Sequence, residues 1–250
     1  MNLQRDRSAW LHGPEQRCQQ PLPHVVQPRR IILLGAPGVG KGTQAALLSA
    51  TLGACHLSTG DIFRLARSTS PSELTPGMGI AIERMKRGEL VSDETVIQIV
   101  RERLGCLACR GGFLLDGFPR TVPQAAVLDV LLKHQNLKID AVVSYDLPEP
   151  ELIARIGGRR TCPVCKAVFH TQLRPPRKEG VCDTCGTGLV QREDDLPGAV
   201  HVRQAAYLES TAPLLAYYRE QRLLVHVPAT GVPEEVFGRT LIALAAHFER

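Results

Sequence analysis

The chain has 250 residues, 44% of them hydrophobic, which is long enough and apolar enough for one or two domains with a buried core. Its net charge of +5 comes from basic residues dispersed among acidic ones, so small phosphate-bearing molecules explain the excess as well as a nucleic acid would. No apolar stretch is long enough to cross a bilayer, and residues 1–30 lack the apolar core of a secretory signal. We therefore expect a cytosolic protein with neither a membrane nor a nucleic-acid partner.

The first thirty residues are rich in Gln, Pro and Arg and have no apolar periodicity, which predicts a disordered tail over residues 1–30. At residues 31–34 a run of Ile-Ile-Leu-Leu, closed by Gly35, is typical of a strand buried on both faces, and the ordered domain is expected from residue 31. Strands alternating with helices predict a doubly wound parallel α/β sheet. The further strands are predicted at residues 112–115, 141–145 and 223–227, and the helices near residues 42–52, 92–104, 121–133, 149–158, 199–221 and 233–248.

The segment GAPGVGKGT at residues 35–43 lies where the first strand gives way to a helix, as a phosphate-binding loop requires. Its glycines allow consecutive backbone N–H groups to turn inward on phosphates, next to the positive end of the helix. Lys41 is placed to reach the β- and γ-phosphates, and Thr43 to support Mg²⁺. The strict pattern has Ser or Thr directly after the lysine, whereas here Gly42 intervenes. A nucleotide site is the prediction.

Two later segments indicate what the nucleotide site does. STGDIFR at residues 58–64 offers a helix start with a hydroxyl, an acid and an arginine one turn later, which suits a second phosphate group. FLLDGFPR at residues 113–120 is a buried strand that ends in Asp116, followed by a turn that projects Arg120. Asp116 fits a Mg²⁺ role through water.

Residues 160–197 interrupt the alternation of strands and helices with Cys, Pro and Gly, and read as an inserted module without an apolar core of its own. Cys162 and Cys165 are followed after sixteen residues by Cys182 and Cys185, the spacing of a structural zinc site. Four thiolates leave no open position, so Zn²⁺, one per chain, would fold the module and not catalyse, and His170 and His201 are not needed as ligands. The remaining cysteines, at positions 18, 55, 106 and 109, are interpreted as structural.

The motifs GAPGVGKGTQ, STGDIFR, LLDGFPRTVPQA, GRR, REDD and TAPLLAYY occur in the order and approximate spacing of bacterial adenylate kinases. The chain resembles the long-lid, zinc-containing type of that family over residues 31–248. The resemblance implies a monomeric enzyme that converts ATP and AMP to two ADP with Mg²⁺. It also implies a core of residues 31–250, with an AMP-binding insertion at residues 58–91 and a lid at residues 158–195.

The resemblance also implies which residues hold each substrate. For ATP these are Gly38, Val39, Gly40, Lys41, Gly42, Thr43, Arg155, Arg159, Val168, Phe169 and Gly231. For AMP they are Thr59, Arg64, Glu89, Leu90, Val91, Gly117, Phe118, Pro119, Arg120, Gln124, Arg192 and Arg203. The catalytic set implied is Lys41, Arg120, Arg159, Arg192 and Arg203, while Asp194 and Asp195 are expected to pair with lid arginines.

Cations suit this reaction because the transferred phosphoryl group spreads its charge over three oxygens, and the AMP phosphate is already ionised near neutral pH. Another preference, for GTP as donor or UMP or CMP as acceptor, stays open, although Thr59 and Gln124 favour adenine. A zinc-ribbon, P-loop switch that binds nucleic acid is a more remote alternative. It is disfavoured because residues 166–189 have mixed charges and few aromatic side chains.

Overall fold

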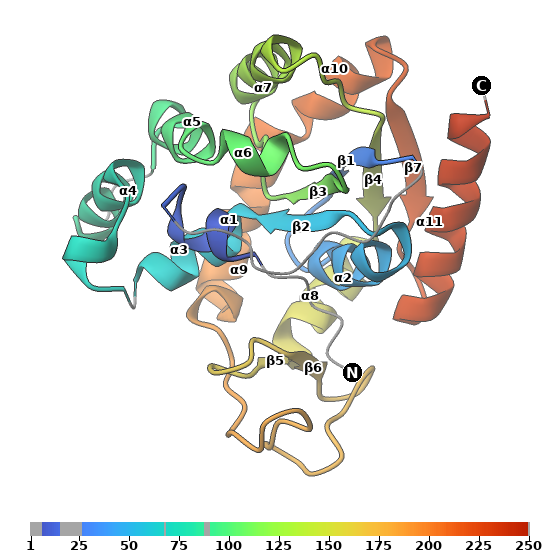
Figure 1. Cartoon of the computed structure of the whole chain (residues 1–250). Coiled ribbons are helices and arrows are strands. Elements are labelled where there is room, and N and C mark those ends of the chain that lie inside the picture. The colour runs from blue at the N-terminus through green and yellow to red at the C-terminus, as the bar shows by residue number, and fades with distance from the viewer. Residues whose placement is uncertain (1–6, 16–26, 68, 88–90, 250) are drawn as a thin grey trace.

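Five short strands pair in parallel to form the central sheet. The computed structural model describes residues 7–15, 27–67, 69–87 and 91–249, and within them the strand order is β2-β3-β1-β4-β7 (Figure 1). Along the chain, at least one helix separates each strand of this sheet from the next. These helical connections allow all five strands to run in the same direction, as parallel pairing needs. The predicted doubly wound parallel sheet is confirmed. The strands are β1 (Arg29–Leu34), β2 (Cys55–Ser58), β3 (Gly112–Asp116), β4 (Ala141–Asp146) and β7 (Leu224–Pro228).

The helices follow the amphipathic stretches of the sequence, with one division. The predicted helix at residues 199–221 is split by a π-helical turn, Tyr207–Thr211, just before Pro213, which has no N–H to continue the ladder. Among the described residues, no helix combines the length and apolarity needed to cross a membrane. The α-helices are α1 (Ser8–His12), α2 (Lys41–Leu52), α3 (Thr59–Ala66), α4 (Pro76–Lys86), α5 (Asp93–Arg101), α6 (Leu104–Leu107), α7 (Val122–His134), α8 (Glu149–Gly158), α9 (Pro197–Ala206), α10 (Pro213–Glu220) and α11 (Pro233–Phe248).

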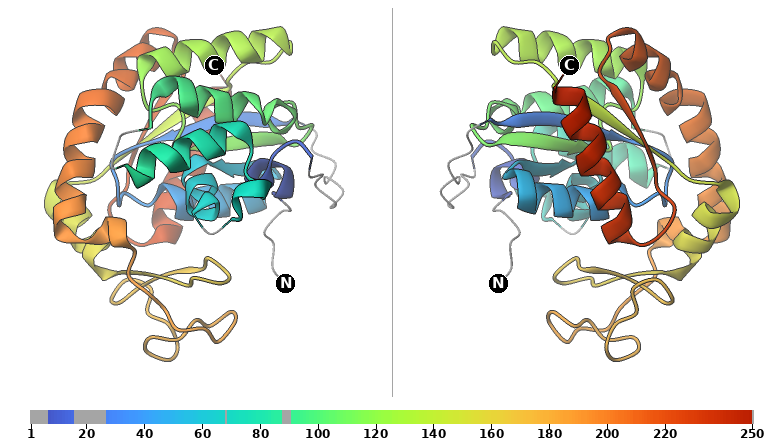
Figure 2. Two further views of the ribbon diagram at one scale, coloured as in Figure 1. Left: turned by 90° about the vertical axis from the view of Figure 1, so that its left-hand side faces the viewer. Right: turned by 90° about the vertical axis from the view of Figure 1, so that its right-hand side faces the viewer.

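The sheet is covered on both faces because successive side chains of its strands, which point to opposite faces, are apolar. In β1, Ile31 and Leu33 pack in a core with α2 and α11, whereas Ile32 and Leu34 pack in a second core with α7 and α10. Figure 2 shows α11 along one side of the sheet. Two buried faces explain why β1 reads as a continuous apolar run.

The four-cysteine module leaves the sheet after α8 and returns at α9, and it projects from the bottom of the molecule in Figure 1. It contains a short antiparallel pair, β5 (Arg159–Thr161) and β6 (Val168–His170). Its buried apolar cluster consists of Cys162, Phe169 and Cys182. So small a cluster supports the prediction that something other than apolar packing holds the module.

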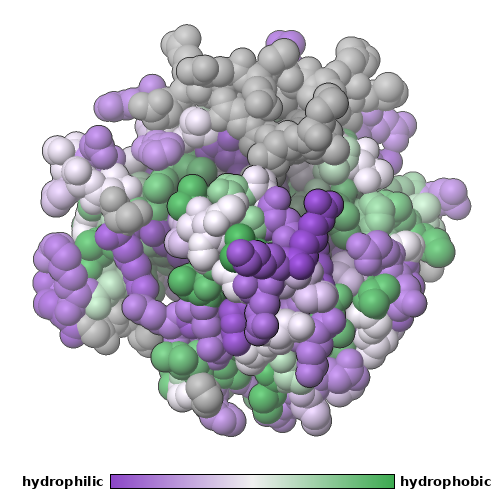
Figure 3. Space-filling model, turned by 90° about the horizontal axis from the view of Figure 1, so that it is seen from below, coloured by the Kyte–Doolittle hydropathy of each residue, from purple (hydrophilic) through white to green (hydrophobic). Residues whose placement is uncertain are grey.

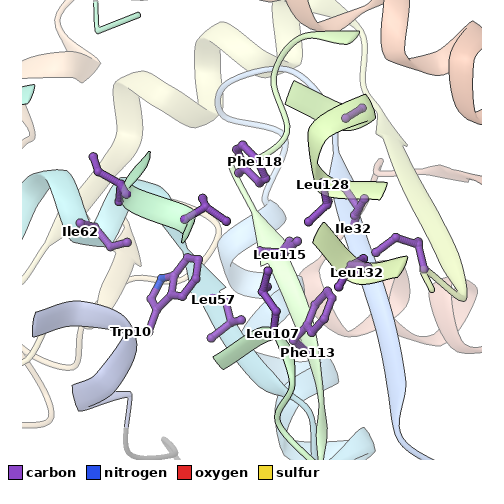
Figure 4. Packing of buried hydrophobic residues seen from close by; sticks show 14 of the residues in the cluster. Trp10, Ile32, Leu57, Ile62, Leu107, Phe113, Leu115, Phe118, Leu128 and Leu132 are labelled. Carbon is purple, nitrogen blue, oxygen red and sulfur yellow. The ribbon is translucent and has the colours of Figure 1, made fainter. Parts of the chain in front are cut away.

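The N-terminal region corrects one expectation. Residues 8–12 form α1 and not a disordered tail, and β1 begins at Arg29, two residues before the predicted start. The Trp10 side chain is fully buried in the same core as Leu57 and Ile62 (Figure 4). A single large aromatic side chain buries enough apolar area to hold a short helix in place, without any periodic pattern in the sequence.

Candidate active site

The phosphate loop occupies the connection between β1 and α2. Its backbone follows a path that a side chain would obstruct, because Gly38 has a φ of +86° and a Cβ there would lie 2.3 Å from Ile156 Cγ1 on α8. Since α2 begins at Lys41, the N–H groups of its first turn are free of helical partners and point toward the loop. Lys41 Nζ donates to Gly35 O at 2.6 Å and to Ala36 O at 3.1 Å, so the ammonium lies inside the loop. Loop, helix end and lysine form an anion cradle.

Asp116 ends β3 beside this cradle. Its position is opposite Leu33 of β1, and a Cβ on Gly42 would lie 3.6 Å from Asp116 Oδ2. Burial raises the pKa of the Asp116 carboxyl, but His56, 3.5 Å away, and the nearby cations outweigh burial and lower it below its usual value. Asp116 is therefore an ionised carboxylate, the form that a water-bound Mg²⁺ needs.

The turn after β3 brings Arg120 next to the start of α3. Arg120 Nε donates to Gly117 O at 2.8 Å, which folds the guanidinium back over the turn. A Cβ on Gly117 would lie 2.8 Å from Thr59 Oγ1 and 3.4 Å from Arg120 Nη2. Thr59 and Arg120 therefore border the same small space, into which a second anion could fit.

Gln124 supports this turn from below and is only 3% exposed. Its Oε1 accepts from Arg120 N at 2.8 Å, and its Nε2 donates to Asp93 Oδ1 at 2.7 Å. The other Asp93 oxygen accepts from Thr121 Oγ1 at 2.6 Å. The amide thus fixes the Arg120 turn to α5, and a contact with adenine would have to use its second N–H.

Arginines at both ends of the cysteine module pair with two acids. Arg159 binds Asp195, which is 2% exposed, through both carboxylate oxygens, with Nε to Oδ2 at 2.7 Å. Arg203 Nη1 lies 3.0 Å from Asp194 Oδ2 and 3.7 Å from Asp195 Oδ1. The expected pairing with a lid arginine is confirmed for Asp195, whereas Asp194 pairs with Arg203 on α9, just after the lid. Arg192 lies between Arg159 and Arg203 in the chain, and its Nε donates to Thr161 Oγ1 at 2.9 Å.

Basic side chains from four separate parts of the chain come close enough to repel one another. Burial and, to a lesser extent, the charges of neighbouring arginines together lower the pKa of Lys41 to about 8, despite the attraction of Asp116. Burial, then the charges of Arg159 and Arg64, lower the pKa of Arg192 to about 10. A polyanion would relieve this repulsion. The cluster consists of Lys41, Arg64, Arg120, Arg159, Arg192 and Arg203.

Figure 3 shows the molecule from below the view of Figure 1, the side from which the cysteine module projects, and hydrophilic residues gather at the centre of that face.

Arg155 of α8 joins two loops near the phosphate loop's anion cradle. Its Nη2 donates to Ala229 O at 2.8 Å and to Gly231 O at 2.9 Å, and its Nη1 to Val39 O at 3.4 Å. Arg155 thereby fixes the turn after β7 against the phosphate loop.

Other predicted site residues lie elsewhere or cannot be placed. Phe169 is 5% exposed and packs on Cys162 and Cys182 inside the module, with Val168 half-buried beside it. Phe118 is buried in the main core, against which Val91 packs. Glu89 and Leu90 lie outside the described residues.

The four module cysteines gather as a metal site requires. Their sulfur atoms all lie within 4.8 Å of one another, and Cys162 to Cys185 and Cys165 to Cys182 are each 3.4 Å apart. Thiolates at 2.3 Å from a tetrahedral Zn²⁺ would be about 3.8 Å apart, so the set fits zinc with little adjustment. His170 is not part of it, because its Nδ1 accepts from Gln172 N and Leu173 N, each at 3.0 Å. Cys55 Sγ and Cys109 Sγ, 3.7 Å apart, pack in or against the main core, and Cys18 lies outside the described residues.

The sequence does not reveal the residues that orient other side chains of the site, because they lie far from those side chains in the chain. Arg7, 54 positions from Asp61, binds its carboxylate, and Asp93 holds Gln124 from 31 positions away. His56 contacts Asp116 across the β2–β3 pair. The sequence would have placed His56 near Asp116 only if β2 had been recognised as a strand and paired in parallel with β3.

Comparisons with known proteins agree with this geometry. A family model described as adenylate kinase matches residues 33–223. An adenylate kinase of Streptomyces avermitilis is 47% identical over 216 residues, which cover 86% of this chain and 96% of the relative. One of Carboxydothermus hydrogenoformans is 45% identical over 216 residues, covering 86% and 99%, and one of Caldicellulosiruptor bescii is 50% identical over 196 residues, covering 78% and 89%. The chain belongs to the adenylate kinase family.

Proposed function

We propose that this enzyme catalyses the reversible, Mg²⁺-dependent transfer of a phosphoryl group from ATP to AMP, which yields two ADP and serves adenine nucleotide homeostasis. The observation that carries the proposal is the cluster of six basic side chains. It extends from the phosphate loop to the space that Thr59 and Arg120 border. Mutual repulsion makes such a cluster costly unless anions occupy it. A donor polyphosphate and an acceptor monophosphate together supply those anions.

The donor would lie on the phosphate loop. Backbone N–H groups of residues 38–43 and the Lys41 ammonium suit the β- and γ-phosphates. Arg155 holds the turn that carries Gly231 against Val39, so this turn is placed to contact the adenine through its backbone. The donor phosphates then face Arg159 and Arg203.

The acceptor would lie between α3 and the turn after β3, within an AMP-binding insertion of residues 58–91. Arg64 and Arg120 supply charge for the AMP phosphate, and Thr59 borders the same space. Gln124, through its second N–H, and the backbone near Val91 are proposed to contact the base. Glu89 and Leu90 are proposed for the same role from the sequence resemblance alone.

Catalysis would consist of alignment and charge stabilisation, because the acceptor oxygen needs no base to remove a proton. Bound Mg²⁺ would neutralise charge on the donor phosphates, and Asp116, through water, and Thr43 would hold it. Arg192 and Arg203 would contact the transferred group from the module side, since Arg192 lies near the end of a lid formed by residues 158–195 and Arg203 lies on α9, which follows it.

The four cysteines are proposed to bind one Zn²⁺, which would order the lid and take no part in the reaction. The ion pairs of Arg159 and Arg203 with Asp194 and Asp195 lie where the lid rejoins the core, so they would fix its hinge. We expect the enzyme to act as a monomer in the cytoplasm.

The test is a screen of nucleotide pairs with the purified protein and Mg²⁺. ATP with AMP should give ADP at the highest rate, and GTP as donor or UMP or CMP as acceptor should be poor. Lys41→Met should lose most of this activity, because the loop would lack its charge. A protein that binds ATP but forms no ADP in response to AMP would refute the proposal.

A further inference from the structure

We propose that residues 7–13 are a positioning element for the AMP side of the active site, with Arg7 acting on Arg64 through Asp61. The inference rests on the proposed function. It concerns a segment that precedes residues 33–223, the part of the chain that the family model matches. Three sets of contacts carry it.

The first set is a relay of charges. Arg7 Nη1 binds Asp61 Oδ2 at 2.9 Å, and Arg64 Nη2 binds the other oxygen, Oδ1, at 2.5 Å. The same Arg7 nitrogen donates to His56 O at 3.3 Å, which fixes it on β2. The Arg7 and Asp61 side chains are 15% and 25% exposed, so solvent screens this pair only partly. Arg7 therefore sets the orientation of the carboxylate that holds Arg64.

The second set fixes the beginning of α3. Trp10 Nε1 donates to Ser58 O at 3.0 Å, and the indole is fully buried near Leu57 and Ile62 (Figure 4). Ser58 is the N-cap of α3, and its Oγ accepts from Asp61 N at 3.3 Å. The indole thus holds the residue that caps α3, the helix that carries Thr59, Asp61 and Arg64.

The third set ties the segment to the start of α4 and to Arg103, between α5 and α6. Arg103, which is 1% exposed, donates from Nε to Trp10 O at 2.5 Å. Gly13, with a φ of +103°, lies so close to Thr75 that a Cβ would come within 2.5 Å of Thr75 Cγ2. One short segment therefore joins β2, α3, α4 and the end of α5, the elements that surround the acceptor side of the site.

Without Arg7, Asp61 would keep Arg64 as its partner but lose the contact that fixes its own rotamer. The Arg64 guanidinium would then sample more orientations, and AMP binding would have to order it. Donor binding at the phosphate loop involves none of these residues. The expected signature is a defect in AMP affinity that leaves ATP affinity unchanged.

The experiment compares Arg7→Gln, Arg7→Lys and Trp10→Phe with the full-length protein, and Arg101→Gln, at an exposed arginine of α5, is the matched control. We expect the KM for AMP to rise about three- to tenfold in Arg7→Gln and Trp10→Phe, since each loses one or two hydrogen bonds. The KM for ATP and kcat at saturating AMP should stay within twofold of wild type. Arg7→Lys should recover most of the loss, and Arg101→Gln should behave as wild type.

Trp10 is the single tryptophan of the chain, so its fluorescence reports docking without any activity measurement. Acrylamide should quench the native protein much less than the denatured protein. Equal quenching in both states would overturn the proposal, as would an Arg7→Gln KM for AMP within twofold of wild type or no recovery in Arg7→Lys. If wild type binds AMP but does not phosphorylate it, the proposed reaction fails, and the positioning role is decided by whether Arg7→Gln weakens AMP binding.

Discussion

Lys41 should make ATP binding depend on pH in a way that the structure specifies. Burial lowers the pKa of its ammonium from 10.5 to about 8 in the protein without nucleotide. Phosphate oxygens at the loop would favour the charged form, so ATP binding above pH 8 must be accompanied by proton uptake. At pH 8.5, a group with a pKa of about 8 is about three-quarters deprotonated, and ATP should take up about that fraction of a proton.

The assay is isothermal calorimetry of a non-hydrolysable ATP analogue with Mg²⁺ between pH 7 and 9.5, in pairs of buffers that differ in ionisation enthalpy. The Kd should rise about tenfold between pH 7 and pH 9. Lys41→Arg should remove the dependence, since an arginine keeps its charge throughout this range. A flat Kd in wild type, or the same slope in Lys41→Arg, would refute the reasoning.

The lowered pKa of Lys41 also makes the free energy of unfolding depend on pH. Because the folded pKa of Lys41 lies below the unfolded value of 10.5, the folded state binds fewer protons between about pH 8 and 10.5. The contribution of Lys41 to stability therefore rises with pH through that window, and below pH 8 its burial costs roughly 3 kcal/mol. Anion binding should relieve this cost, so ATP should raise the melting temperature most below pH 8.

Three other predictions concern the phosphate loop, the proposed lid hinge and the proposed zinc site. Gly38→Ala should raise the KM for ATP at least tenfold because its Cβ would overlap Ile156, whereas Gly105→Ala, which has open space, should not; equal values would contradict the loop geometry. Asp195→Asn should lower the free energy of unfolding in urea by about 3 kcal/mol and reduce kcat, since Arg159 would lose its buried carboxylate. Cys182→Ser should bind one zinc fewer per chain than wild type by mass spectrometry and melt at a lower temperature. An unchanged zinc content would exclude these cysteines as ligands.

Strong local patterns make the core and the cradles predictable. The apolar run at residues 31–34 and the loop at residues 35–43 predict a buried strand followed by a phosphate-binding loop, and the structure has the buried strand and a helix that begins at Lys41 after the loop. The cysteine spacing specifies a cluster in the same way, because it needs only four residues on two turns. Such signals depend on neighbours in the chain and not on the tertiary fold.

Features that depend on distant contacts escape sequence reasoning. β2, Cys55–Ser58, contains His and Ser among its four residues, so it lacks the apolar run of a buried strand. α1 has five residues and is held by one indole against residues 48 positions away. The role of Gln124 beneath the Arg120 turn likewise depends on Asp93, which no local motif connects to it.

The most direct test of the account follows the transferred phosphate itself. The enzyme would be incubated with Mg²⁺, AMP and ATP labelled in its γ-phosphate, and the products resolved by phosphorus NMR or chromatography. The account predicts that the label appears in the β-phosphate of ADP, with one AMP consumed for each ATP. Label released as inorganic phosphate with AMP unchanged would contradict it.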